Sequence, residues 1–305
     1  ATNTTGSANV TVGMNSLKQN TTGSYNTSMG EGALLDNTTA SNNTAVGQTA
    51  MRFNTTGTNN VALGKDALYA NTTGGNNTAV GHTALDSNTT ASSNTGIGWG
   101  SLAANTTGAS NTGVGQDSGY TTTTGIQNVF VGHAAHSAVA GTNNQVVIGF
   151  NVSGNGAGYG TLGMSSTKSW INFGATSWAG SSDSRLKDNI TTSTVGLSFI
   201  NDLRPVTFEW KTKGSIPETF EAYEKDSADR YNDNDKVIHG FIAQEVKAAI
   251  DLHSDIGSGH GLWETTPDGT QALAQGQLVP MLTKAIQELS AQLDAALARI
   301  TTLEG

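Results

Sequence analysis

The sequence contains no cysteine, and charged and aromatic residues make up only 13% and 6% of it. The absence of cysteine excludes disulfides and thiolate metal sites. No run of about 18 apolar residues occurs, which argues against membrane insertion. The net charge of −9 argues against nucleic-acid binding, since phosphate contacts require clustered lysines and arginines. We expect no cofactor, no metal, no nucleic-acid partner and no membrane insertion.

The few charges are distributed unevenly along the 305 residues. Residues 1–181 contain 4 Lys+Arg and 5 Asp+Glu, whereas residues 182–305 contain 11 and 19. The chain contains 38 glycines, most of them in the first region together with small apolar residues, a composition suited to a wide, thin core. The change in composition predicts a domain boundary between residues 181 and 182.

A 17-residue repeat occupies the first region. Nine glycines mark it: Gly13, Gly30, Gly47, Gly64, Gly81, Gly98, Gly115, Gly132 and Gly149. An apolar residue precedes each glycine, and an asparagine (Gln145 in the last unit) stands four positions before it. A second apolar column follows four positions after the glycine, at Leu17, Leu34, Met51, Leu68, Leu85 and Leu102.

Each repeat unit is interpreted as a short strand, a tight turn, a second short strand around T-A-L, and an "NTTG" or "NTTA" loop. Strict registry with many turn formers predicts a mainly β fold, a β-solenoid over residues 1–149 with one coil per repeat. Coils stacked about 4.8 Å apart would align the asparagines in a hydrogen-bonded ladder. Residues 150–181 break the period and introduce Trp170, Phe173 and Trp178. We expect irregular strands that close the solenoid, with a carbohydrate-binding tip as the alternative.

A coil this thin has little interior, so the two apolar columns cannot both be buried. One column is expected to pack against neighbouring chains, which suggests a trimeric shaft. The units "NNTAVG" (42–47) and "NNVALG" (59–64) resemble the N-S-V-A-I-G head repeats of trimeric autotransporter adhesins and related phage fibre shafts. The sequence starts inside a repeat, with "NTTG" at 3–6, and is expected to be the C-terminal piece of a longer fibre.

Three features of the repeat region have competing interpretations. The N-T-T tripeptides match glycosylation sequons but are expected to be loop residues. His133 and His136 could ligate a metal, although a surface loop is the preferred interpretation. Trp99 could stack on a sugar, and a contact between chains of a trimer is the preferred alternative.

The region after residue 181 has the composition of an ordinary α+β domain. Residues 195–211 predict a short amphipathic helix and then a strand, residues 236–250 a strand running into a helix, and the acidic segment 212–235 a loop. Apolar residues near the end alternate at spacings of three and four: Val279, Leu282, Ile286, Leu289, Leu293, Ala296, Ile300 and Leu303. This heptad seam predicts a coiled-coil helix over about 279–304, three-stranded if the shaft is trimeric.

The boundary stretch "SSDSRLKDNI" (181–190) contains Ser182 and Lys187, five residues apart. A serine hydroxyl is a poor nucleophile until a base removes its proton, and a desolvated lysine can do so. A turn could bring the amine of Lys187 to the hydroxyl of Ser182 while Asp183 and Arg185 pair elsewhere. A solvated turn between two domains is the alternative.

The stretches "SDSRLKDNI", "LRPVTFEWK" and "HGFIAQEV" and a terminal heptad helix occur in that order. Over residues 182–305 this order resembles the endosialidase-type intramolecular chaperone domain. Domains of this self-cleaving serine peptidase family stand at the end of phage tailspikes and tail fibres. The resemblance implies that Ser182 is the nucleophile, Lys187 the base, and the bond between Ser181 and Ser182 the one that is cut.

The resemblance also places a histidine near the site. His239 is expected to orient the dyad or polarise the carbonyl, or else to be purely structural. Backbone amides around Gly240 are candidate oxyanion donors.

The expected protein is a phage tail-fibre shaft, located in the virion, whose C-terminal domain trimerises, chaperones folding and then cuts itself off as a single-turnover endopeptidase. Its partners would be two further copies of the chain and a host cell-surface receptor, with carbohydrate as one candidate. The chaperone domain would be released in the host cytoplasm during assembly. The alternative is a bacterial surface adhesin or structural stalk with a trimerisation domain that does not cleave. A conventional hydrolase is disfavoured, since the repeat contains no acid pair or triad.

Overall fold

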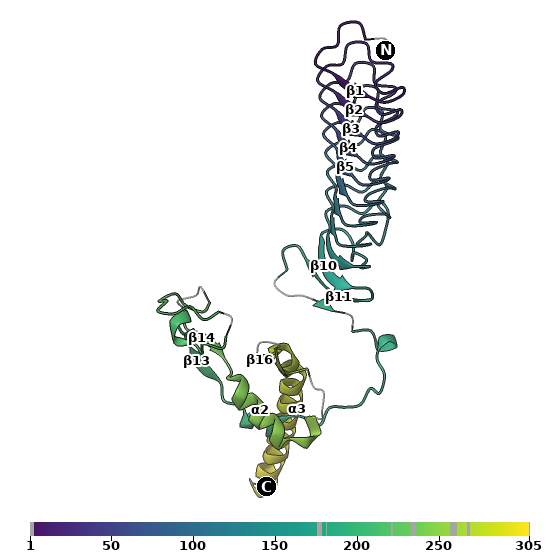
Figure 1. Cartoon of the computed structure of the whole chain (residues 1–305). Helices are drawn as coiled ribbons and strands as arrows, with labels where there is room; N and C mark the ends of the chain where they lie inside the picture. Colours follow the sequence, from purple (N-terminus) through teal and green to yellow (C-terminus); the bar gives the residue numbers. More distant parts are fainter. Residues whose placement is uncertain are drawn as a thin grey trace. The chain divides into compact units, whose positions relative to one another are not determined.

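The computed structural model describes residues 3–175, 179–180, 182–220, 222–232, 236–256, 261–266 and 269–304. The chain divides into two compact units, Ala1–Asp188 and Asn189–Gly305, each described here by itself (Figure 1). The expected domain boundary between residues 181 and 182 remains a prediction. None of the described helices has the length and apolar character needed to cross a membrane.

The first unit is a β-solenoid of parallel strands, each hydrogen-bonded to the strand of the next coil (Figure 1). Partners lie 17 residues apart, as in Thr44 opposite Val61 and Ala45 opposite Ala62. Its strands are β1 (Val10–Val12), β2 (Thr27–Met29), β3 (Thr44–Val46), β4 (Val61–Leu63), β5 (Thr78–Val80), β6 (Thr95–Ile97), β7 (Thr112–Val114), β8 (Val129–Val131) and β9 (Val146–Phe150). The predicted β-solenoid with a 17-residue repeat is confirmed.

The prediction of a second strand in each coil, around T-A-L, is wrong. That stretch is a turn, and its leucine or methionine adopts the left-handed conformation, with φ of 50° at Leu34 and 49° at Met51. The turn points this side chain inward, and its N–H donates to the carbonyl of the next coil, 3.0 Å from Leu34 N to Ala50 O. Burial and this hydrogen bond offset the cost of a left-handed non-glycine residue, about 1–2 kcal/mol.

The close stacking of the coils requires glycine at the repeat positions. Gly47 has a φ of +138°, and a Cβ there would lie 2.3 Å from the carbonyl oxygen of Gly64 on the next coil. Only glycine tolerates both the conformation and the contact.

The interior of the solenoid holds one apolar column and leaves the other outside. The column four residues after each glycine is buried, together with the alanines of the strands. The column just before each glycine is exposed or half-buried, as at Met29, Leu63, Ile97 and Val114. One of the two columns therefore lacks cover within the chain, as the thinness of the coil predicts.

The predicted asparagine ladder is confirmed on the strand side of the coil. Asn60 illustrates it, with its backbone N–H donating to Oδ1 of Asn43 at 3.0 Å and its Nδ2 to the carbonyl of Gly74 at 2.9 Å. These asparagines are fully buried, so each coil satisfies polar groups of its neighbours.

A second ladder, not predicted, uses the asparagines of the N-T-T tripeptides. Nδ2 of Asn71 donates to Oδ1 of Asn54 at 2.8 Å and to the carbonyl of Gly74 at 2.9 Å. Its own Oδ1 accepts from Asn88 at 2.9 Å. The N-T-T asparagines from Asn20 to Asn105 are buried, so their amides cannot carry a glycan in the folded shaft, whereas Asn3 in the first coil is exposed.

The period ends with longer strands. β10 (Tyr159–Met164) continues the sheet in parallel with β9, and β11 (Thr167–Asn172) turns back against it as an antiparallel hairpin. The short strand β12 (Ala179–Gly180) follows on β11. Trp178, one of the aromatic residues expected in this closing segment, lies outside the described residues.

The second unit is a small α+β fold that ends in a 27-residue helix. Its helices are α1 (Leu197–Asp202), α2 (Ala243–Leu252) and α3 (Leu278–Glu304), and its strands pair as β13 (Val206–Phe208) with β14 (Ile238–Gly240) and β15 (Trp263–Thr265) with β16 (Gln271–Leu273). Short 3-10 turns lie at Ser184–Leu186 in the first unit and at Lys213–Ser215, Ser254–Ile256 and Gln275–Gln277 in the second. The predicted elements of 195–211 and 236–250 and the terminal helix are confirmed.

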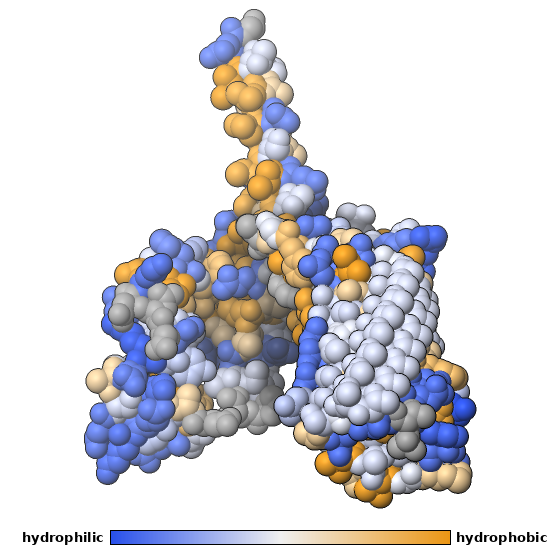
Figure 2. Space-filling model, turned by 90° about the horizontal axis from the view of Figure 1, so that it is seen from above, coloured by the Kyte–Doolittle hydropathy of each residue, from blue (hydrophilic) through white to orange (hydrophobic). Residues whose placement is uncertain are grey.

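The start of α3 packs into this unit, and most of its length does not. Leu278 joins a core with Val195, Phe199, Val246 and Ile250. The predicted seam residues remain exposed, namely Ile286, Leu289, Leu293, Ile300 and Leu303. Figure 2 shows apolar residues along the projecting helix. A coiled coil would cover them, and it remains a prediction.

Glu288 of α3 holds the start of α1. Its Oε2 accepts the N–H of Leu197 at 2.8 Å, and a Cβ on Gly196 would lie 2.5 Å from that oxygen. The hydrogen bond from Leu197, helped by Lys284, keeps the pKa of Glu288 below its ordinary value of 4.5.

Replacing Asn71 by alanine should destabilise the shaft by about 2–4 kcal/mol, because buried partners on two neighbouring coils lose their hydrogen bonds. The matched control is Thr73→Ala, an exposed residue of the same loop. Denaturant unfolding followed by far-ultraviolet circular dichroism measures both. Equal midpoints for the two variants would contradict a structural role for the second ladder.

The second unit should lose stability as the pH falls through the lowered pKa of Glu288. A carboxyl with a depressed folded pKa stabilises fully above its unfolded value of 4.5 and loses that contribution below it. Glu288→Gln should be less stable than the parent at pH 7, and the difference should narrow at pH 3. Unfolding monitored by the helical signal at 222 nm tests this, with Glu264→Gln, an exposed strand residue, as control. A difference independent of pH would refute the assignment.

Candidate functional site

A 3-10 turn at Ser184–Leu186 organises the boundary stretch. Asp183 caps it, with its side chain accepting from the N–H of Arg185 at 2.9 Å. The N–H of Lys187 bonds to the carbonyl of Ser184 at 3.1 Å and closes the turn. The chain therefore returns on itself between residues 182 and 187.

The turn brings the two predicted dyad residues together. Nζ of Lys187 donates to Oγ of Ser182 at 2.8 Å. Within the single chain both side chains are exposed. A lysine acts as a base only in its neutral form, and desolvation favours that form. The geometry of a serine–lysine pair is therefore present locally, while the surroundings that would activate it are not supplied by the exposed turn.

Asp183 and Arg185 pair with each other beside the dyad. Nε of Arg185 donates to both carboxylate oxygens of Asp183, at 3.0 and 3.1 Å. This contact lowers the pKa of Asp183 and raises the pKa of Arg185. With its carboxylate engaged by Arg185, Asp183 does not compete with Ser182 for the amine of Lys187.

Ser181, which would supply the attacked carbonyl, lies outside the described residues. The direction of attack on its carbonyl is therefore not part of the observed geometry, and the cleavage position remains a prediction.

His239 and Gly240 belong to the second unit, on β14. They pair across the sheet with Thr207 and Val206 of β13. An open hollow of about 480 Å³ adjoins them, lined by Pro205, Val206, Thr207, His239, Gly240, Phe241 and Gln275. The sequence places both residues near the dyad only by resemblance, and their roles remain predictions.

The hollow includes residues that sequence reasoning missed. Gln275 comes from a 3-10 turn 35 positions after Gly240 and lies close to it, 3.6 Å from where a Cβ of Gly240 would stand. The ring of Phe208 would lie 3.2 Å from that Cβ. A side chain at position 240 would therefore press against the ring of Phe208. No local pattern could reveal Gln275, since the tertiary fold alone brings it there.

No group of three or more potential metal ligands gathers among the described residues. His133 stacks on Phe150 with centroids 5.1 Å apart, and Nδ1 of His136 contacts the carbonyl of Ala134 at 2.8 Å. These contacts are those of surface side chains packed between neighbouring coils.

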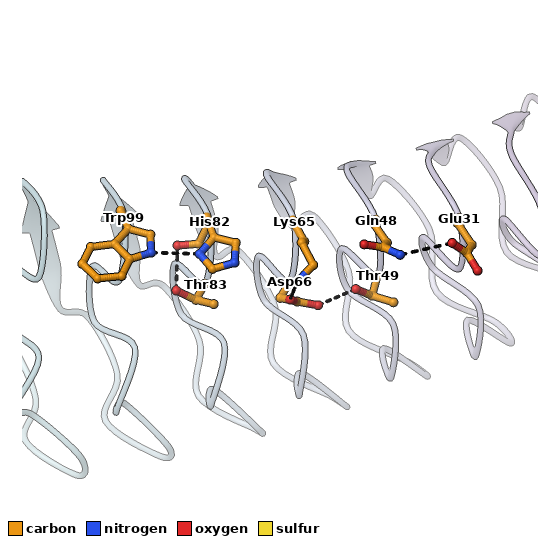
Figure 3. A network of polar contacts seen from close by, with 8 residues as sticks. All are labelled: Glu31, Gln48, Thr49, Lys65, Asp66, His82, Thr83 and Trp99. Atoms are coloured by element: carbon orange, nitrogen blue, oxygen red, sulfur yellow. Dashed lines mark hydrogen bonds and ion pairs between the residues drawn. The ribbon is translucent and has the colours of Figure 1, made fainter.

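The outer face of the shaft carries a column of polar side chains just after the repeat glycines (Figure 3). Nε2 of Gln48 donates to Glu31 at 3.1 Å, and Nε1 of Trp99 donates to Nδ1 of His82 at 2.8 Å. Trp99 therefore satisfies its donor within the chain. Its expected contact with a sugar or a neighbouring chain remains a prediction.

Comparison with known protein families gives a match, and it covers the region that contains Ser182 and Lys187. Residues 182–254 match the model of the family described as chaperone of endosialidase. By this match, residues 182–254 are similar to chaperones of endosialidase. This chaperone-like segment begins at Ser182 and contains Lys187, His239 and Gly240. No curated protein and no solved structure matches the chain.

Proposed function

We propose that the protein is the shaft of a phage tail fibre whose C-terminal domain trimerises the chain, chaperones its folding and releases itself by autocleavage. The observation that carries the proposal is the hydrogen bond between Lys187 and Ser182 at the first residue of the chaperone-like segment. The assembled fibre would belong to the virion and attach to a host cell-surface receptor.

Cleavage would proceed in two balanced steps. Oγ of Ser182 attacks the carbonyl carbon of Ser181 as Lys187 removes the hydroxyl proton. The amide nitrogen of Ser182 takes a proton and leaves as an amine, so that an ester joins the two residues. Water then hydrolyses the ester, giving a carboxylate on Ser181 and restoring the hydroxyl of Ser182.

Assembly is the step proposed to activate the dyad. The turn is exposed in the single chain, and contact with neighbouring chains would exclude water from the amine of Lys187. His239 would then orient the dyad or polarise the carbonyl, with Gly240 as a candidate oxyanion donor, or His239 would serve only the fold.

Two uncovered apolar surfaces support a homotrimer. One is the outer column of the solenoid and the other is the seam of α3. A periodic shaft also needs a register, because sliding one chain by 17 residues would present the same columns again. A terminal three-stranded coil would fix that register before the shaft closes, and its removal would leave the shaft kinetically trapped.

Autocleavage should divide the chain into residues 1–181 and 182–305, as seen by denaturing electrophoresis and intact mass. Ser182→Ala and Lys187→Ala should leave the chain whole. Ser184→Ala, in the same turn, and Ser181→Ala, which keeps the attacked carbonyl, should still be cut. An uncut parent chain that has folded and assembled would contradict the enzymatic proposal and leave the stalk or adhesin with a non-cleaving trimerisation domain.

The assembled particle should have three times the chain mass by light scattering. In the uncut Ser182→Ala background, the double change Leu289→Asp and Leu293→Asp should remove the trimer, because charges would enter the seam. Ala291→Asp places one charge of the same sign on the opposite face of α3 and should leave the trimer intact. A monomeric parent particle would refute the oligomeric proposal independently of cleavage.

A further inference from the structure

Three side chains on two neighbouring coils form a cluster away from the boundary stretch. The guanidinium carbon of Arg52 lies 5.5 Å from the ring centroid of Phe53. The rings of Phe53 and Tyr69 meet edge to face, with centroids 4.9 Å apart. We call these three residues the Arg52 cluster.

The Arg52 cluster departs from the repeat in ways the coil does not need. Arg52 is the only arginine in residues 1–181. Its equivalent in the preceding coil is Leu35, and the equivalent of Phe53 in the following coil is Ala70. The preceding coil therefore forms the same turn without a guanidinium at the Arg52 position, and the following coil forms it without a phenyl ring at the Phe53 position.

One side-chain polar atom of the cluster lacks a partner among the described residues. Nε of Arg52 is buried without a hydrogen bond. The carboxylate of Asp36, on the adjacent coil, accepts instead from Nε2 of Gln19 at 2.7 Å. Phe53 is 38% exposed. A guanidinium without an acceptor beside an exposed ring differs from Trp99, whose donor is satisfied by His82.

The chemistry of the cluster defines what would complement it. A guanidinium binds carboxylates through parallel, charge-assisted hydrogen bonds. Exposed aromatic rings offer an apolar contact, and the phenol of Tyr69 adds a polar tip. A sugar ring that carries a carboxylate combines an apolar C–H face, hydroxyls and one negative charge. We propose that the Arg52 cluster binds an acidic saccharide, with its carboxylate on the terminal Nη atoms of half-buried Arg52 and its ring against Phe53 and Tyr69.

Two acids flank the cluster and shape its selectivity. Asp36 lies on the preceding coil, and Asp86 lies on the coil after Tyr69, where burial raises its pKa. Their oxygens can accept hydrogen bonds from sugar hydroxyls. They also disfavour densely charged polyanions, which restricts the site to saccharides with isolated acidic groups.

An acidic saccharide would be the receptor, or part of it, in the proposed function. Only this biological role of the Arg52 cluster rests on the proposed function. Binding is measured on the uncut Ser182→Ala protein, so a failure of autocleavage does not affect the result.

Calorimetric titration with two matched pairs of probes tests the proposal. The pairs are 3′-sialyllactose with lactose, and a glucuronate-containing tetrasaccharide with its carboxyl-reduced form. At least one acidic probe should bind about tenfold or more tightly than its neutral counterpart, and Arg52→Leu should abolish that preference. Phe53→Ala should lower the affinity for the acidic probe by a similar factor. Both replacements copy residues of neighbouring coils, so the thermal midpoint should be preserved.

Lys65→Gln is the matched control, since Lys65 is a surface cation of the shaft that pairs with Asp66 at 3.0 Å. It should leave binding unchanged. An equal loss of probe binding in Lys65→Gln would indicate non-specific electrostatic attraction and would overturn the proposed site. Equal binding of acidic and neutral probes, or binding of phosphorylated lactose alone, would also overturn it. A change of particle mass in Arg52→Leu would show instead that Arg52 contacts another chain.

Discussion

The stacking of one coil on the next through buried asparagines is the interaction on which the shaft depends. Asn60 ties its backbone and side chain to neighbouring coils, and Asn71 does the same on the loop side. A single coil cannot satisfy these groups, because their partners lie on adjacent coils. The interior amides are therefore paired only when several coils are stacked, which makes the repeat cooperative. The longer strands β10 and β11 provide the last coil with a partner at the end of the period.

The narrow cross-section of the solenoid coil limits the size and number of side chains that its core can hold. The interior holds small strand residues such as Ala45 beside the turn column represented by Met51. Where Phe130 occupies the strand position, the turn position beside it is Gly119, which leaves room for the ring. The column that includes Leu63 is left outside, and the seam of α3 is left uncovered in the second unit. Both surfaces are regular along their length, as expected of surfaces that meet identical copies. The narrow cross-section of the solenoid thus leaves outside the chain an apolar column that the proposed assembly would cover.

The boundary stretch shows how little structure a hydrogen bond between a serine and a lysine requires. Five residues and one 3-10 turn place the amine of Lys187 on the hydroxyl of Ser182, and the Asp183–Arg185 pair removes the nearest competing carboxylate. The local geometry is complete without a core. Activation is a different matter, because it depends on excluding water, which an exposed turn cannot do. Proximity and reactivity are therefore separated, which is what the proposed cleavage after assembly would require.

The sequence alone determined the features that repeat or that lie close together along the chain: the 17-residue coil, the strand-side asparagine ladder, the heptad helix and the pairing of Ser182 with Lys187. Tertiary structure decided which apolar column is buried, because that depends on the direction in which a left-handed turn points Leu34. It also decided that the N-T-T asparagines form a second ladder, that Gln275 lines the hollow beside Gly240, and that Nε of Arg52 finds no acceptor among the described residues. Each of these depends on atoms that meet across coils or across the fold, and spacing within a segment does not encode such meetings.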